Sequence, residues 1–296
     1  MSNSTFVQRQ ITLTIQLGEG SFGDSGFNTV TLTGLRISAA IDKSGMPGFN
    51  MAEIRIFGLD LNLMNQLCTL GKPIVRDRNN TITVMAGDAT AGLSLAYSGI
   101  ITEAWADFNG APEVVFNIKS VFGKLDATKP VPAISYSGPT DTGHILSTIA
   151  LSLGYGFESN GVSVLLNNPY YPGTAREQAY AIGKDAGIYV YFDDVKKVLS
   201  TWPLNGFRGG SIPLISPQTG MIGYPSYAGT DVIVRTLYNP NIVFGGQFQV
   251  QSSLNIANAT WIANKVVHNL ESEMPNGQWF TQIQGYKLGN EPTVPS

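Results

Sequence analysis

The run Gly-Glu-Gly-Ser-Phe-Gly at residues 18–23 has the spacing with which glycine-rich loops hold nucleotide phosphates. A protein kinase would continue with a Val, a strand carrying Ala-x-Lys, and His-Arg-Asp and Asp-Phe-Gly segments. Here Ser25 stands at the Val position, and the other segments do not occur. A dinucleotide-binding loop would lead into a helix, whereas a threonine-rich, strand-like segment follows here. The pattern therefore favours a loop between two strands over a phosphate site.

Histidine chemistry would have to use His144 or His268, because the sequence has no other histidine. His144 lies at the start of a predicted helix, and His268 lies on a predicted strand just before Asn269 and Glu271. A metal site or a catalytic triad needs histidine beside further ligands or a nucleophile. The motifs H-E-x-x-H, G-x-S-x-G and C-x-x-C are missing. A structural polar contact is therefore the favoured interpretation of both histidines.

Carboxylates offer a second possible chemistry, that of a glycosidase, which needs two acids across a scissile bond. The acids that could supply such a pair are Asp77, Asp88, Glu103 and Asp107. Because they are scattered at the ends of predicted strands, we interpret them as solvated. The pair Asp193-Asp194 precedes Lys196-Lys197 and is interpreted as the turn of a hairpin. We therefore expect no catalytic, cofactor-binding or metal residues and no enzyme activity.

Composition favours a β-rich protein whose surface is largely covered by neighbours. Of the 296 residues, 43% are hydrophobic and only 13% are charged, well below the usual quarter, and the net charge is −3. No basic patch for stable nucleic-acid binding and no run of 18 apolar residues for a membrane span occurs. The N-terminus lacks the pattern of a signal peptide, and the single Cys68 fits synthesis in a reducing compartment. The four tryptophans are interpreted as packing or interface anchors: Trp105, Trp202, Trp261 and Trp279.

Alternation of apolar and polar residues predicts strands in the first part of the chain. These strands cover residues 9–17, 29–41, 51–58, 80–86, 93–105 and 113–121. Residues 60–71 predict one short helix, with Asp60 or Asn62 as its cap and Gly71 at its end. Its apolar face would be formed by Leu63, Met64, Leu67 and Cys68.

A change of character follows the three prolines within residues 126–139, which indicate a boundary. Helices are predicted over 141–154 and 174–187, each ending at a glycine, and Thr174 with Glu177 has the spacing of a capping box. A hairpin formed by residues 188–193 and 196–202 follows. Strands then return at 211–216, 231–238, 245–253, 261–272 and 277–288. The predicted fold class is mainly β, or α+β overall, with a small inserted αβ module.

Several segments in a fixed order resemble the baseplate hub proteins of contractile-tailed bacteriophages. The segments that carry this resemblance over residues 30–290 are 52–59 with 64–67, 84–87 with 97–101, 215–225, 231–237 with Asn239-Pro240, 246–250, and 265–270 with 278–281. In 215–225, Gly220 and Gly223 would allow positive φ, while Pro225 and Pro240 would interrupt strand pairing. These residues would turn the chain between sheets.

The resemblance implies a homotrimer in which each subunit carries two tail-tube-like β-barrel or sandwich domains. Three subunits would form a pseudo-sixfold ring between the sixfold tail tube and the threefold central spike. The corresponding domains would be 5–128 (completed by part of 206–235), the αβ insert 130–205, the second tube-like domain 206–290 and a flexible tail 291–296.

The partners implied are the chain itself, the spike protein, a tail tube or tube-initiator protein, the tape measure protein and other baseplate proteins. DNA would pass only transiently through the lumen, no membrane would be bound, and the ring would be assembled in the host bacterial cytoplasm and end in the virion tail baseplate. Three alternatives stay open: a hexameric tail tube or tube-initiator protein, the hub of a phage-like secretion particle, and a tail-associated cell-wall hydrolase.

Overall fold

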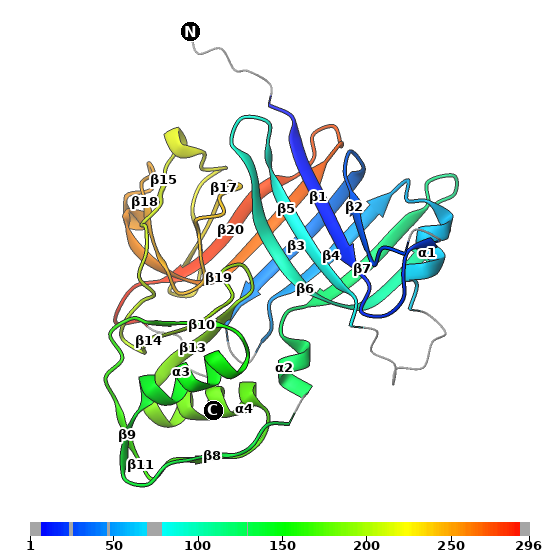
Figure 1. Ribbon diagram of the computed structural model, residues 1–296. Coiled ribbons are helices and arrows are strands. Elements are labelled where there is room, and N and C mark those ends of the chain that lie inside the picture. Colours follow the sequence, from blue (N-terminus) through cyan, green and yellow to red (C-terminus); the bar gives the residue numbers. More distant parts are fainter. Residues whose placement is uncertain (1–6, 24–25, 46–47, 70–78, 129, 291–296) are drawn as a thin grey trace. The chain divides into compact units, whose positions relative to one another are not determined.

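A computed structural model describes residues 7–23, 26–45, 48–69, 79–128 and 130–290 (Figure 1). The chain forms two compact units. Unit 1 contains the described residues within Met1–Asp42, Asn50–Phe122 and Val267–Thr281, and unit 2 contains those within Lys43–Phe49, Gly123–Val266 and Gln282–Ser296. In the part of the chain that the structure describes, no helix is both long and apolar enough to cross a membrane.

Unit 1 is built on one antiparallel sheet, in which the order of neighbouring strands is β19, β3, β4, β7, β6, β5, β1 and β2. Its strands are β1 (Arg9–Gln16), β2 (Thr29–Leu32), β3 (Arg36–Ser44), β4 (Met51–Phe57), β5 (Thr81–Asp88), β6 (Gly92–Asp107), β7 (Val115–Val121) and part of β19 (Ala259–Ser272) and β20 (Trp279–Tyr286). The predicted strand 29–41 is wrong as a single element, because Gly34 takes a φ of 67° and separates β2 from β3.

The alternation read from the sequence decides which face of this sheet is buried. In β1, Ile11, Leu13 and Ile15 are buried, while the intervening threonines are only partly buried. Leu13 lies opposite Val84 of β5, which is also buried. Because successive side chains of a strand point to opposite faces, this register places the β-branched and leucine side chains of both strands in one core.

Helix α1 (Leu61–Leu67) belongs to unit 1 and is one turn shorter than predicted. The Asp60 side chain caps it by accepting hydrogen bonds from the backbone N–H groups of Asn62 and Leu63. Met64 and Leu67 are its buried residues. Cys68 follows the helix and is not part of its apolar face, and Gly71 lies outside the described residues.

Unit 2 begins with an αβ module of two helices on a three-stranded sheet with the order β10, β14, β13. Figure 1 shows α3 and α4 side by side next to this sheet. The elements are α2 (Lys124–Thr128), β8 (Ile134–Ser135), β9 (Pro139–Asp141), α3 (Thr142–Ser152), β10 (Gly156–Ser159), β11 (Leu165–Asn167), β12 (Tyr170–Tyr171), α4 (Ala175–Ala186), β13 (Ile188–Asp193) and β14 (Val198–Pro203). The predicted helices and hairpin are confirmed, but β10, which lies parallel to β14, was not predicted.

Local capping explains where the two helices begin and end. Asp141 accepts a hydrogen bond from the His144 N–H at the start of α3. At the start of α4, Thr174 and Glu177 form the predicted capping box, in which each side chain accepts from the other's backbone N–H. The chain leaves α4 through Gly187 at a φ of 61°, a left-handed conformation that suits glycine.

The rest of unit 2 is a sheet with the order β16, β17, β20, β19, β18, β15. The strands not yet given are β15 (Leu214–Ile215), β16 (Ser226–Ala228), β17 (Asp231–Leu237) and β18 (Gln247–Val250), and the short helices are η2 (Pro217–Thr219) and η3 (Asn255–Ala257). The core of this sheet contains Val232 and Val234 of β17, Phe248 of β18, and Trp261 of β19. The predicted strand 211–216 is reduced to two residues, since a turn begins at Ser216.

The glycines and prolines of residues 216–225 shape a connection between strands, but the expectation that it joins two sheets is wrong, because β15 and β16 belong to the same sheet. Ser216 and Thr219 cap η2 reciprocally, and Gly220 and Gly223 take φ values of 103° and 73°. β15 pairs with β18. After β15 the chain pairs with β17, first at Met221 and then through β16. Pro225 stands directly before β16. These conformations let one short segment pass from one edge of the sheet to the other.

We expect Thr174→Ala to lower the free energy of unfolding of unit 2 by about 1 kcal/mol, because it removes the side-chain acceptor at the start of α4. Glu177→Gln is the matched control, since its amide oxygen can still accept from the Thr174 N–H. Urea unfolding followed by circular dichroism measures both variants. Equal stability of the wild type and Thr174→Ala would contradict this role of the cap.

Candidate functional site

The glycine-rich run 18–23 lies in the connection between β1 and β2, as predicted from the sequence. Backbone hydrogen bonds join Leu17 to Asn28 and Phe22 to Phe27 across this connection. Gly20 and Gly23 take positive φ values of 83° and 53°. Among the described residues, the strand β2 is the next strand or α-helix after the run, whereas a dinucleotide-binding loop would lead into an α-helix. Ser25 lies outside the described residues.

Both histidines make structural contacts. His144 is exposed in the first turn of α3, and its ring meets the ring of Tyr136 edge-on at 6.0 Å between centroids. His268 is 2% exposed on β19, and its Nδ1 lies 2.9 Å from the Thr281 hydroxyl on β20. The His144 ring packs against an aromatic ring and the His268 ring lies at hydrogen-bond distance from a hydroxyl, so the interpretation of both as structural is consistent with the geometry.

The acids considered for a glycosidase pair are engaged separately. Asp88 accepts hydrogen bonds from the Thr90 and Ala91 N–H groups in the turn between β5 and β6. Glu103 forms an exposed ion pair with Lys119 at 3.1 Å, and Asp107 accepts from the Asn109 N–H. Asp77 lies outside the described residues. Within the described ranges, no group of three or more His, Cys, Asp or Glu side chains is placed to hold a metal ion.

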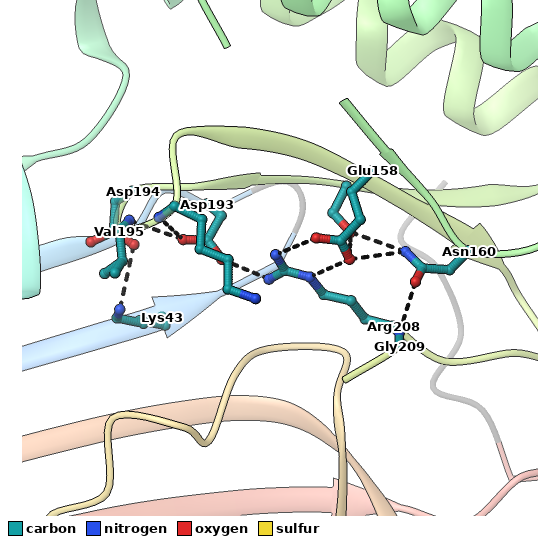
Figure 2. A network of polar contacts seen from close by, with 10 residues as sticks. Lys43, Glu158, Asn160, Asp193, Asp194, Val195, Arg208 and Gly209 are labelled. Carbon is teal, nitrogen blue, oxygen red and sulfur yellow. Dashed lines mark hydrogen bonds and ion pairs between the residues drawn. The ribbon is translucent and has the colours of Figure 1, made fainter. Parts of the chain in front are cut away.

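The most concentrated polar arrangement of the described chain is an ion-pair network in unit 2, here called the Arg208 network (Figure 2). It consists of Arg208, Glu158, Asp193, Asn160 and Ser200. The Arg208 Nε and Nη2 donate to the two carboxylate oxygens of Glu158 at 2.9 and 3.0 Å, and its Nη1 donates to Asp193 at 2.7 Å. This two-pronged geometry is the one in which a guanidinium holds a carboxylate best.

Hydrogen bonds from neutral groups complete the Arg208 network. The Asn160 amide and the Ser200 hydroxyl both donate to Glu158, at 3.1 and 3.0 Å. The Asn160 carbonyl oxygen in turn accepts from the Gly209 N–H at 2.8 Å, directly after Arg208. Asp193 accepts from the backbone N–H groups of Val195 and Lys196. Almost every polar atom of the network is thus engaged by another member or by adjacent backbone.

A second ion pair lies next to the network. Asp194 is fully buried, and its Oδ1 is 3.6 Å from the ammonium of Lys43, whose side chain is also nearly buried. Figure 2 shows Asp194 and Lys43 beside Asp193. The interpretation of Asp193-Asp194 as a hairpin turn is therefore incomplete: the pair does stand at the turn, but both acids are buried and form ion pairs.

Burial and charge act against each other on these acids. Burial disfavours the ionised form of Glu158, but the hydrogen bonds and charge of Arg208, with Asn160 and Ser200, outweigh it and lower the pKa of Glu158 from 4.5 to about 2. Burial likewise opposes ionisation of Asp193, and the charge of Arg208 together with the Lys196 N–H lowers its pKa overall. The pKa of Arg208 is raised, because its two carboxylates outweigh its burial. All three groups are therefore charged at neutral pH.

The network fixes the segment that returns from the αβ module to the second sheet of unit 2. The Arg208 N–H donates to the Gly245 carbonyl at 2.8 Å, and Gly245 pairs with Ala263 of β19. Alongside, Phe244 stacks on Tyr191 at 4.8 Å and packs against Trp202. A Cβ on Gly245 would lie 2.4 Å from the Trp202 ring, so this position has room for glycine alone.

The chemistry of the Arg208 network is that of a fixed structural connection. Its guanidinium is fully buried, and one N–H of each of its three nitrogens donates to a carboxylate, so the group is not presented to a substrate at the surface. Sequence reasoning missed Glu158, Asn160, Arg208 and Lys43. The sequence has only 13% charged residues, and one signal is that some of them stand in short segments that contain several glycines, such as Asn205–Gly210.

Free strand edges form the second functional feature of the described chain. β2 ends the strand order of unit 1, and its exposed residues include Thr29 and Thr31. In unit 2, β16 ends the order on one side and all three of its residues are exposed, while β15 pairs only with β18 on the other side. Such edges carry backbone donors and acceptors that another chain can pair with.

Comparisons with known proteins agree with the resemblance drawn from the sequence. A family model described as "Baseplate hub gp41" matches residues 10–283 of the chain. No curated protein matches the sequence.

Solved structures with a similar fold include the tail protein from Neisseria meningitidis MC58, with a TM-score of 0.61 and 8% identity, covering 94% of this chain and 97% of that one. The 43 kDa tail protein of prophage MuSo2 from Shewanella oneidensis has a TM-score of 0.62 and 8% identity, covering 95% and 97%. A chain of the Francisella PdpA–VgrG complex has a TM-score of 0.51 and 9% identity, covering 100% of this chain and 61% of that one. At these identities the likeness concerns the fold, and it agrees with the predicted mainly β class.

Replacing Arg208 with Met should destabilise unit 2 by about 3–5 kcal/mol, because it leaves Glu158 and Asp193 without their cation. Lys119→Met is the control, since its ion pair with Glu103 is largely exposed and is worth about 0–1 kcal/mol. Urea unfolding at pH 7 measures both. Similar losses in the two variants would mean that the Arg208 network does not stabilise the fold.

Acid should weaken unit 2 in a defined range of pH. Because the pKa of Glu158 is lowered from 4.5 to about 2 on folding, ionised Glu158 stabilises the folded state above pH 4.5, and this contribution is lost as the pH falls from 4.5 through 2. Urea midpoints measured between pH 7 and pH 2 should fall less steeply for Glu158→Gln than for the wild type or for Glu103→Gln. Parallel curves for all three proteins would contradict the assignment.

Proposed function

The chain belongs to the baseplate hub gp41 family, and from this premise we propose that three copies form a ring that joins the sixfold tail tube to the threefold central spike. Membership makes the chain a structural component of the phage tail baseplate that interacts with other tail and baseplate proteins. The proposal adds the number of copies, the symmetry and the named neighbours. The family match over residues 10–283 is the observation that carries it.

The two units give the proposal its physical basis. Each unit contributes its own set of β-strands and its own buried core, and the strand order ends at β2 in unit 1 and at β16 in unit 2, both of which have exposed residues. Three copies with two such units would place six sheets around one axis, and strand edges of neighbouring copies would pair. A ring of this kind would cover the exposed edge threonines and the many exposed apolar side chains, which suits the low charge of the chain.

The domains in this proposal are two tube-like β domains, at 5–128 and 206–290, and the αβ insert 130–205. Residues 206–235 lie in unit 2, whereas Val267–Thr281, the ends of β19 and β20, belong to unit 1. In this proposal Val267–Thr281 is therefore counted with the first tube-like domain, and the second consists of the rest of 206–290. The spike, a tail tube or tube-initiator protein and the tape measure protein would be the neighbours, DNA would cross the lumen only transiently, and assembly would take place in the host bacterial cytoplasm.

A second candidate function is the hub of a phage-like secretion particle. It is favoured by the similarity in fold to a chain of the PdpA–VgrG complex, a match that covers 100% of this chain and 61% of that one. The same ring would serve in either particle. A hexameric tube protein would have six copies where a hub has three, so the mass of the particle in solution distinguishes a tube protein from a hub.

The purified chain should have the mass of three copies in solution, measured by light scattering behind a sizing column at two concentrations. Replacing Thr29 and Thr31 on the β2 edge with Lys should shift the mass towards one copy, because clustered lysines on an edge oppose strand pairing. Thr90→Lys, in the exposed turn between β5 and β6, is the control and should leave the mass unchanged. A mass of six copies, or of one copy at both concentrations, would contradict the proposal.

A further inference from the structure

Unit 2 carries an open cleft of about 390 Å³ beside the turn that joins β16 to β17. Trp261 is among its lining residues; it is only 2% exposed, and its Nε1 donates to the Ala257 carbonyl at 2.9 Å. Tyr227 of β16 meets this ring edge-on at 6.3 Å between centroids, and Ile256 of η3 lines the cleft while 69% exposed. The cleft is thus a fixed aromatic surface with exposed apolar side chains around it.

The charge in this cleft is a single cation. Lys287 lines it with its ammonium 4.7 Å from the centre of the Trp261 ring. Across the described residues, no carboxylate lies within ion-pair distance of Lys287, although the chain as a whole is negatively charged. An ammonium held against an aromatic face still has donors for a carboxylate. The cleft therefore complements an acidic group next to an apolar one.

The strand that borders the cleft has an unused edge. β16 (Ser226–Ala228) pairs in antiparallel register with β17 and ends the strand order, so its outer side has no strand partner in the described chain. Tyr227 belongs both to this strand and to the cleft lining. A free edge beside a pocket is the arrangement in which proteins bind an extended segment: the backbone pairs with the edge and side chains enter the pocket.

We propose that β16 and this cleft bind an extended segment of a different baseplate protein, in which an apolar side chain packs on the exposed side chains of Tyr227 and Ile256 and the carboxylate two residues further on, which points to the same face of the segment, pairs with Lys287. A second copy of the chain is the less suitable occupant, because a lateral contact in a ring needs one edge of unit 2, and β15 offers the other. The inference rests on the proposed function for the source of the partner, but its test does not need the assembled particle.

The probe is a fluorescein-labelled decapeptide, Gly-Thr-Val-Thr-Leu-Thr-Glu-Thr-Val-Gly, in which Leu and Glu share one face of a strand, titrated with the full chain and followed by fluorescence anisotropy. Saturable binding with a Kd below about 1 mM is expected. Replacing its Glu with Lys should weaken binding about threefold or more, because the ion pair with Lys287 is lost and a like charge takes its place. Methylating alternate backbone nitrogens should abolish binding, because the peptide can then no longer pair as a strand.

Variants of the chain locate the binding site. Ile256→Asp should weaken binding at least about tenfold, since it places a like charge beside the peptide carboxylate, and Lys287→Gln should weaken it about threefold. The matched controls are Leu151→Asp, at an exposed leucine of α3, and Lys184→Gln, at an exposed lysine of α4, and both should bind as the wild type does.

Failure of the acidic peptide to bind, or equal binding to Ile256→Asp and to the wild type, would overturn the inference. So would a loss of the trimeric mass in Ile256→Asp, because β16 would then be a contact between copies. If the chain is a trimer but does not bind the peptide, this inference alone is refuted. If the chain is a monomer and binds the peptide, only the proposed ring is refuted.

Discussion

A β-strand can satisfy its backbone N–H and C=O groups only beside another strand or in water, and this requirement governs the whole chain. Unit 1 leaves β2 at the end of its sheet, and unit 2 leaves β15 and β16. The strands are short at these edges and carry exposed threonine, serine and tyrosine, which tolerate both water and a partner. The proposed ring is one solution to this constraint, and an added segment at β16 is another.

The chain has few charged residues, and those that are buried in the described part of the chain, such as Arg208, Asp193 and Asp194, lie in unit 2. Taking Arg208, Glu158 and Asp193 out of water is costly, and their mutual attraction offsets that cost only because the hydrogen bonding is nearly complete. An apolar cluster could have held the return segment as firmly. The ion pairs add a fixed direction, since the planar guanidinium donates to its two carboxylates in one geometry, and so they set how the αβ module joins the second sheet within unit 2.

Much of the fold follows from local sequence rules. Alternation predicted most of the long strands, and the Thr174 capping box and the Gly187 stop fixed the ends of α4. Short elements such as β10 were not predicted, because four residues are too few to show an alternation of apolar and polar side chains. The pairing of β10 with β14 is set by the rest of the module. The Arg208 network was not predicted for a related reason. Arg208 lies 50 residues from Glu158 in sequence, and a single charged residue between glycines is typical of a solvated loop. The order of weak motifs indicated the family, and the match over residues 10–283 confirms it.

Electron cryomicroscopy of the purified chain tests the central claim most directly, because it reports the number of copies and the symmetry of their β units together. The account predicts a closed threefold ring in which six β-sheet densities surround one lumen, with neighbouring copies joined along strand edges. Particles with true sixfold symmetry, or single copies whose strand edges remain free, would contradict it.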